Sequence, residues 1–108
     1  MTAKELLYRM PKALDPQAAA EIAAVIQYET SEPVYQILEG GVMTVRDGRA
    51  EAPDLVLRIG DADLVELFSG RLNPMNAFMM GKLKLTGDVA LARKLVGLID
   101  RDKLAEEQ

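Results

Sequence analysis

Two aspartates, Asp61 and Asp63, form the pair of side chains whose spacing first suggests chemistry. Carboxylate oxygens are ligands for divalent cations, but a cation site needs more than two of them. The pair also stands where the sequence pattern predicts the start of a helix. Carboxylates there accept hydrogen bonds from free backbone N–H groups and interact favourably with the helix dipole. We therefore interpret both as helix-start residues, and we expect no metal site and no cofactor.

The serine and threonine hydroxyls lack a partner that could activate them for nucleophilic attack. The chain contains no histidine and no cysteine, which removes the commonest general base and all thiol chemistry. Gly81-Lys82 is not a phosphate-binding loop, because Leu83 follows it and no glycine-rich turn precedes a helix. The sequence therefore predicts no catalytic residue, and an independent enzyme is the weakest of the functions considered.

Positive charge is sparse in this chain, which carries 13 lysines and arginines against 17 acidic residues and a net charge of −4. A protein that binds nucleic acid needs a basic patch, and none is visible, so we expect no nucleic-acid partner. Lys82 and Lys84 are most simply the solvated face of a strand, because they alternate with leucines. Their alternative role would be contact with an acyl-CoA phosphate or with an anionic membrane surface.

The most unusual segment is a short methionine-rich helix. Asn73-Pro74 predicts its start, with Asn as cap and Pro as first helical residue, and Gly81 predicts its end. Almost no polar face remains between them, since the apolar residues include Met75, Phe78 and Met79. A short helix that is apolar all round is either buried on several sides or in contact with something apolar that is not protein. Methionine suits the second role, because its flexible thioether packs around different shapes.

Alternating apolar residues predict five short strands, at residues 22–30, 34–38, 42–46, 55–59 and 83–86. Short turn signals link several of them, which indicates hairpins. The predicted fold is α+β, with a single sheet of about five strands, mostly antiparallel, and helices on one face.

Helix signals frame these strands at both ends of the chain. A capping box of Thr2 with Glu5 begins a first helix that Pro11 should end, and Asp15-Pro16 begins a brief second helix. Further helices are predicted between Asp61, as the cap, and Gly70, and over residues 89–99 after the capping residue Asp88. The charged tail at residues 100–108 should fray.

The predicted helices carry more apolar surface than one small sheet can cover. The faces of the helices at 64–68, 75–80 and 91–99 all compete for one side of the sheet, so part of that surface should enclose a cavity. The alternative interpretation of each residue is ordinary core. The candidate ligand-binding residues are Phe68, Leu72, Met75, Phe78, Met79, Met80, Leu83, Leu95, Leu98 and Ile99.

Length and hydropathy set the remaining expectations. A chain of 108 residues with 49% apolar residues predicts one domain over residues 1–108 with a core of its own. No apolar run approaches the roughly 20 residues of a membrane span, and the N-terminus lacks the pattern of a signal peptide. We therefore expect the cytoplasm as the compartment.

The run from Val42 to Ile99 resembles the sterol carrier protein 2 (SCP2) domain family. The similarity is densest in Gly70-Arg71-Leu72-Asn73-Pro74, Ala77-Phe78-Met79, Gly81-Lys82-Leu83 and Gly87-Asp88-Val89-Ala90-Leu91-Ala92. The resemblance implies a small α+β fold with an apolar tunnel under the C-terminal helix. It also implies binding or transfer of lipids, which include fatty acids, acyl-CoA, phospholipids, sterols and isoprenoids, by a domain that is not itself an enzyme.

Two functions follow as hypotheses. The first is a non-catalytic lipid carrier that holds a fatty acyl, sterol-like or isoprenoid tail and opens at a hinge near Gly97, a glycine inside the last helix. The second is an interaction protein whose methionine-rich surface forms a homodimer or docks to a lipid-biosynthetic enzyme. The expected partners are a lipid ligand, transiently a membrane surface, and a second copy of the chain.

Overall fold

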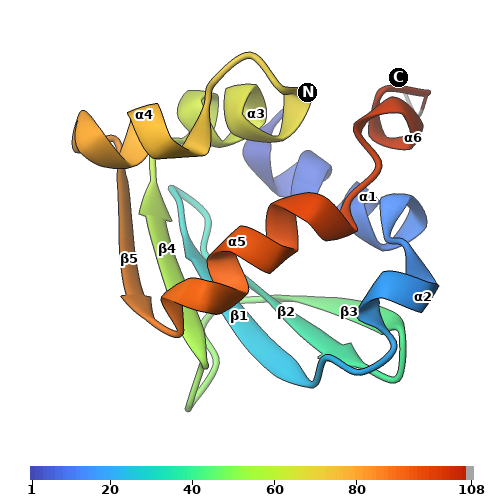
Figure 1. Cartoon of the computed structure of the whole chain (residues 1–108). Helices are drawn as coiled ribbons and strands as arrows, with labels where there is room; N and C mark the ends of the chain where they lie inside the picture. The colour runs from blue at the N-terminus through green and yellow to red at the C-terminus, as the bar shows by residue number, and fades with distance from the viewer. Residues whose placement is uncertain (107–108) are drawn as a thin grey trace.

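Five strands form one mixed sheet in the order β3-β2-β1-β4-β5 (Figure 1). The computed structural model describes residues 1–106. The strands are β1 (Ala24–Glu29), β2 (Val34–Glu39), β3 (Val42–Asp47), β4 (Leu55–Ile59) and β5 (Leu83–Gly87). The central strand, β1, pairs with β4 in parallel, and the other three neighbouring pairs are antiparallel. The predicted α+β class and the mostly antiparallel sheet are confirmed.

The register of the sheet places its large apolar side chains on one face. Ile26 lies opposite both Gln36 and Leu55, and Leu57 lies opposite Leu85, so these residues share a side of the pleat. Most of the residues on this face are buried. The other face is more exposed, as expected of a sheet covered by helices on one side only.

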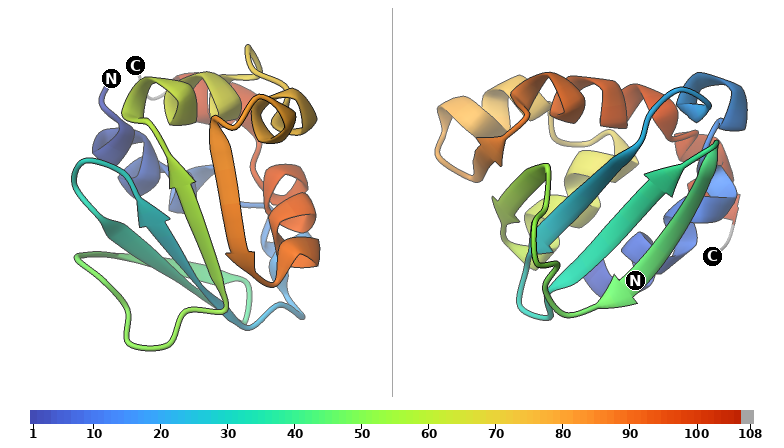
Figure 2. Two further views of the ribbon diagram at one scale, coloured as in Figure 1. Left: turned by 90° about the vertical axis from the view of Figure 1, so that its left-hand side faces the viewer. Right: turned by 90° about the horizontal axis from the view of Figure 1, so that it is seen from below.

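Six helices lie over the buried face of the sheet (Figures 1 and 2). They are α1 (Ala3–Ala13), α2 (Pro16–Ala19), α3 (Asp61–Ser69), α4 (Pro74–Met79), α5 (Val89–Leu98) and α6 (Arg101–Glu106). The longest, α1, has 11 residues, so among residues 1–106 no helix has the length that a membrane span requires.

Four helices begin at the caps that the sequence predicted. The side chains of Thr2, Asp15, Asn73 and Asp88 each accept a hydrogen bond from a backbone N–H group in the first turn. The prediction that Asp61 caps its helix was wrong, because the cap of α3 is Gly60, which makes no side-chain bond. The placement of Asp61 and Asp63 at the start of the helix is confirmed, since both lie in its first turn. The Asp61 carboxylate instead accepts hydrogen bonds from the backbone N–H of Ser31, at 2.9 Å, and from the Ser31 hydroxyl.

The prediction that the first helix ends at Pro11 was also wrong, since α1 continues to Ala13. Proline lacks the N–H group that would bond the carbonyl of Leu7, four residues earlier. The buried side chain of Gln36 in β2 replaces it, because its amide nitrogen donates to the Leu7 carbonyl oxygen at 3.1 Å. Tertiary structure thus satisfies the group that proline leaves free.

The two ends of the chain meet in a way that no local pattern indicated. The last long helix ends at Leu98, not Ile99, and Ile99 pairs with Leu14 in an isolated β-bridge. The N–H of Asp100 donates to the Ala13 carbonyl at 2.8 Å. The chain then forms α6, which packs against α1, so the predicted fraying of the tail was wrong up to residue 106. Residues 107–108 lie outside the described part of the chain.

Candidate functional site

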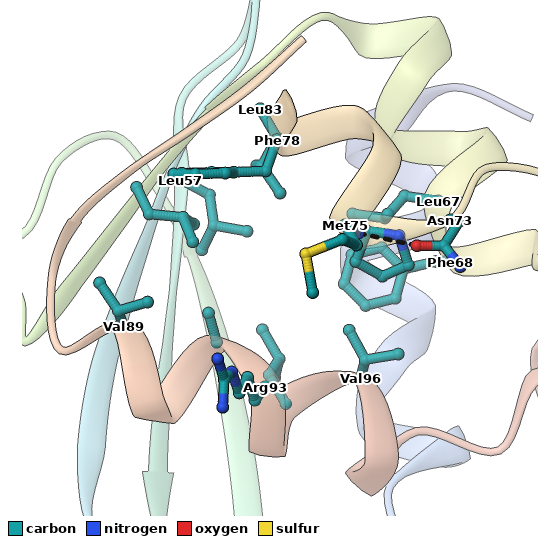
Figure 3. Close-up of a pocket in the computed structure, with 14 residues that line it drawn as sticks. Leu57, Leu67, Phe68, Asn73, Met75, Phe78, Leu83, Val89, Arg93 and Val96 are labelled. Atoms are coloured by element: carbon teal, nitrogen blue, oxygen red, sulfur yellow. Dashed lines mark hydrogen bonds between the residues drawn. The ribbon is translucent and has the colours of Figure 1, made fainter. Parts of the chain in front are cut away.

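A cavity of about 560 Å³ lies between α3, α4, α5 and the strands β4 and β5 (Figure 3). Fourteen residues line it: Leu57, Leu67, Phe68, Asn73, Pro74, Met75, Phe78, Leu83, Leu85, Val89, Ala92, Arg93, Leu95 and Val96. Twelve of them have apolar side chains. The size and character of this space are typical of sites that enclose a small apolar molecule.

The strands supply the floor of the cavity through the pleat. Leu57 of β4 and Leu83 and Leu85 of β5 all belong to the inward face. β5 ends at Gly87, whose φ is +98° and where an added Cβ would come within 2.3 Å of the Asp54 carbonyl oxygen. Only glycine fits this turn, which directs the chain into α5.

One wall of the cavity is α5, which runs across the sheet from the end of β5 towards α1 (Figure 1). Val89, Ala92, Arg93 and Val96 are spaced three and four residues apart, so they form a single stripe along the helix. Three of these four side chains are short. These side chains therefore do not fill the space between α5 and the strands β4 and β5.

The opposite wall is α4, which has little to hold it in place. Asn73 begins the helix by accepting hydrogen bonds from the N–H groups of Met75, at 2.8 Å, and Asn76, at 3.4 Å. Ala77 is its only buried residue. Met75 and Phe78 line the cavity and yet remain 60% and 53% exposed, so large apolar side chains on this wall face water.

The structure brings together five of the ten residues that the sequence proposed for ligand contact. They are Phe68, Met75, Phe78, Leu83 and Leu95. The other five, Leu72, Met79, Met80, Leu98 and Ile99, are not among the lining residues.

The five residues outside the lining fall into three settings. Met79 and Met80 lie on the surface at the end of α4, 76% and 64% exposed. Leu98 and Ile99 are buried where the end of α5 packs next to the start of α2. There the Leu98 carbonyl accepts a hydrogen bond from the Asp15 N–H at 2.8 Å. Leu72 is half-buried in the connection between α3 and α4.

Sequence reasoning missed nine lining residues: Leu57, Leu67, Asn73, Pro74, Leu85, Val89, Ala92, Arg93 and Val96. The strand leucines carried a usable signal, because alternation placed them on the inward face. The stripe on α5 also has helical spacing. The broad apolar surface of that helix hid it, because the sequence does not say which side of α5 meets the core and which meets the cavity.

Polar groups are scarce at the cavity. Only Asn73 and Arg93 carry polar side chains among its lining residues, and the Asn73 oxygen is engaged in capping α4. No acidic side chain lines the space. An apolar molecule would therefore meet hydrocarbon and sulfur along most of this surface.

The groups with shifted pKa values lie away from the cavity. Burial raises the pKa of Tyr28, whose hydroxyl donates to the Gln36 side-chain oxygen at 2.7 Å in the core. On the surface, the Tyr8 hydroxyl donates to Asp47 at 2.5 Å, which lowers the pKa of Asp47 and raises that of Tyr8. These shifts have structural causes and none involves a lining residue.

A second, smaller hollow of about 290 Å³ is polar. Its lining includes Glu21, Asp54, Asp88 and Lys94. Two of its carboxylates already bond the backbone: Asp54 accepts from the Val25 N–H at 2.7 Å and Asp88 from the Leu91 N–H at 3.2 Å. Over residues 1–106, no group of three or more potential ligand side chains is arranged to hold a metal ion.

A family model described as the SCP-2 sterol transfer family matches residues 3–100. Sterol carrier protein 2 of Oryctolagus cuniculus is 43% identical over 60 residues, a match that covers 56% of this chain and 10% of that protein. The chain thus spans about a tenth of the length of that curated relative.

Two solved structures extend the comparison to the fold. Palmitated SCP2L2 from Aedes aegypti is similar with a TM-score of 0.73 and 25% identity, over 90% of this chain and 93% of that one. A stereoselective inverting sec-alkylsulfatase from Pseudomonas sp. is similar with a TM-score of 0.80 and 22% identity, over 84% of this chain and 15% of that one. The second likeness concerns the fold alone.

Proposed function

The chain belongs to the SCP-2 sterol transfer family, and we propose that it is a lipid carrier that encloses one apolar tail in the cavity under α5. The observation that carries this proposal is the apolar cavity itself, which is walled on one side by exposed Met75 and Phe78. Large apolar side chains that line an unfilled space and face water are unfavourable in the free protein, and a bound tail would cover them. The palmitated form of the Aedes aegypti relative supports an acyl chain as one class of tail.

The energetics favour weak selectivity between tails. Covering about 300 Å² of an apolar tail at roughly 25 cal/mol per Å² contributes at most about 7–8 kcal/mol. The freedom that the ligand loses on binding reduces this figure. Dissociation constants in the micromolar range or weaker follow. Apolar area by itself discriminates poorly between acyl, sterol-like and isoprenoid tails.

The proposed role is non-catalytic. Nucleophilic catalysis needs an activated hydroxyl, thiol, amine or carboxylate within reach of the bound molecule. The lining offers one guanidinium and one amide, and neither is a nucleophile. A carrier that binds and releases its ligand unchanged fits this set of side chains.

Ligand entry requires a wall that can move, and we propose α4 as that wall. Its six residues are anchored by the single buried side chain of Ala77. Movement there would widen the opening of the cavity and extend it towards the tunnel expected from the family. Gly97 remains a candidate hinge for the end of α5, where an added Cβ would meet no atom within 4 Å.

Native mass spectrometry of the purified protein, followed by titration of the delipidated protein with a fluorescent fatty acid, tests the carrier function. We expect a co-purifying lipid of one molecule per chain and saturable binding near the micromolar range. If neither is found, the protein is not a carrier of this kind.

The exposed end of α4 favours a second candidate function. Met79 and Met80 are largely exposed and lie outside the cavity lining, so tail binding does not account for them. Flexible apolar side chains of this kind form interaction surfaces, here for a homodimer or for docking to a lipid-biosynthetic enzyme. Sedimentation of the wild type and of Met79→Glu over a range of concentrations separates the outcomes: a dimer that the substitution abolishes supports this function.

Two expectations from the sequence stay predictions. Transient contact with a membrane surface would allow a carrier to load its tail, and a vesicle co-sedimentation assay would detect it. The cytoplasmic compartment would be checked by cell fractionation.

A further inference from the structure

We propose that Arg93 binds the anionic head group of a single-chain lipid at the mouth of the cavity. The carrier would then prefer lipids that end in a carboxylate or phosphate to neutral lipids with the same tail. This inference rests on the proposed function, and it names the ligand class of the same site.

Arg93 is the only charged residue of the cavity lining. Twelve of the other lining residues are apolar, and the thirteenth, Asn73, uses its side-chain oxygen to cap α4. No aspartate or glutamate lines the space. A head group that reaches the rim therefore meets one cation and no competing anion.

The guanidinium of Arg93 is also unengaged. In the part of the chain that the structure describes, no side-chain hydrogen bond or ion pair involves it. By contrast, Arg49 binds Glu29 and Lys82 lies 3.9 Å from Asp63. Arginine presents a planar fork of donors that matches the two oxygens of a carboxylate or the oxygens of a phosphate. Arg93 is therefore free to make this pair with a ligand.

The position of Arg93 on α5 places its charge at the rim. It lies between Val89 and Val96 on the stripe that forms the cavity wall, and it is exposed to solvent (Figure 3). An arginine in such a place covers apolar surface with its aliphatic stem while its charged end stays in water. A tail inside the cavity with its head group at this rim satisfies both parts of the ligand.

The next residue on α5 provides a natural contrast. Lys94 has the same charge and is also exposed, but it lines the smaller polar hollow, together with Asp54 and Asp88. The cavity and the hollow lie on different sides of the helix. If simple positive charge on α5 attracted anionic lipids, both residues would contribute, whereas the geometry assigns the role to Arg93 alone.

The test measures binding of palmitic acid, hexadecyl phosphate and hexadecanol, which share one tail, to the wild type, Arg93→Gln and Lys94→Gln below their micelle concentrations. We expect the wild type to bind one or both anions about 3- to 10-fold more tightly than hexadecanol, since an exposed ion pair is modest in strength. Arg93→Gln should remove that preference, and hexadecanol binding by the same variant measures any effect of the shortened side chain on the tail. Lys94→Gln should change neither.

The two anions distinguish the sources of the head group. A preference for palmitic acid alone indicates a fatty acid, and a preference for hexadecyl phosphate indicates a phosphorylated lipid. Equal wild-type affinities for the anions and hexadecanol, or equal effects of the two substitutions, would overturn the role of Arg93 while leaving the carrier function intact. Failure of all three compounds to bind would overturn both. Thermal melting of each variant confirms that it folds.

Discussion

The covered face of the sheet has a packed half and a hollow half. In the packed half, α1 lies against β2 and β3 and α6 packs on α1, with Leu6, Leu7 and Met10 almost fully buried. Under α4 and α5, along β4 and β5, a cavity remains and apolar side chains face water. Both halves are built mainly from apolar residues, so apolar content does not explain the contrast.

Helix length and anchoring do explain it. α1 has 11 residues and buries five of them, whereas α4 has six residues and buries one. The packed half can therefore supply most of the stability of the fold, and the hollow half can bind a ligand with little change in that stability. The two halves should therefore respond differently to the same kind of substitution.

Truncation of a core side chain should have the largest effect. Leu7→Ala in the packed half removes a fully buried leucine and should lower the free energy of unfolding by about 2–5 kcal/mol. Met75→Ala in the hollow half should cost about 0.5 kcal/mol, because that side chain is mostly exposed. Urea denaturation measures both. Equal losses would mean that the two halves are equally packed.

The second-largest loss of stability should follow from removal of the buried Gln36 side chain. In Gln36→Leu, the carbonyl of Leu7 and the hydroxyl of Tyr28 lose their partner, and each unpaired buried group costs about 1–3 kcal/mol. The matched polar change in the hollow half, Asn73→Ala, removes only a helix cap and should cost about 1 kcal/mol. A Gln36 variant as stable as the wild type would contradict the explanation of how α1 passes Pro11.

Added volume should be tolerated in only one half. Ala13→Leu inserts three carbons into filled core and should cost about 1–3 kcal/mol. Ala92→Leu directs the same atoms towards the cavity, so its stability should stay within about 0.5 kcal/mol of the wild type or rise. The comparison uses one substitution and one denaturation assay. A large loss for Ala92→Leu would indicate that the cavity is smaller than the structure shows.

Alkaline pH should lower the stability of the protein through Tyr28, which is buried in the packed half. Burial raises the pKa of Tyr28 above its unfolded value, so the folded state keeps a proton that the unfolded state loses. That stability is complete below about pH 10 and falls by about 1.4 kcal/mol per pH unit above it. Tyr28→Phe should remove this share of the pH dependence. An unchanged slope in the variant would assign the alkaline loss to other groups.

The smallest effect is expected from Gly97→Ala. Alanine should raise the free energy of unfolding by about 0.5–1 kcal/mol, because glycine is unfavourable inside a helix and an added Cβ meets open space. If Gly97 is a hinge, the variant should also take up a fluorescent fatty acid more slowly in stopped-flow measurements. Unchanged uptake would leave α4 as the only moving wall.

Local chemistry predicts much of this structure from the sequence. Strand β4 begins at Leu55 and ends at Ile59 as its alternation indicates, and the cap residues Asn73 and Asp88 act within one helical turn. These signals depend on neighbours in the chain. The parallel pairing of β1 with β4 does not, because two distant segments decide it together.

The predictions that were wrong also failed where distant segments of the chain decide the structure together. Pro11 predicts a helix end, but Gln36 satisfies the carbonyl that the proline leaves free. The charged tail predicts fraying, but Leu104 is buried as α6 packs against α1. At the cavity, the sequence shows the apolar excess of α4 and α5, but it does not show which side of each helix faces the space. Met79 and Met80 were therefore proposed for the cavity, and Val89 and Arg93 were missed.

Titration of Ala92→Phe with a fluorescent fatty acid shows whether the cavity holds the tail, because the new ring projects from the cavity wall. Ala90→Phe is the matched control, since Ala90 is exposed on the same helix and outside the cavity lining. The cavity account predicts that Ala92→Phe lowers affinity at least about tenfold while Ala90→Phe binds as the wild type does. Equal binding by all three proteins would contradict it.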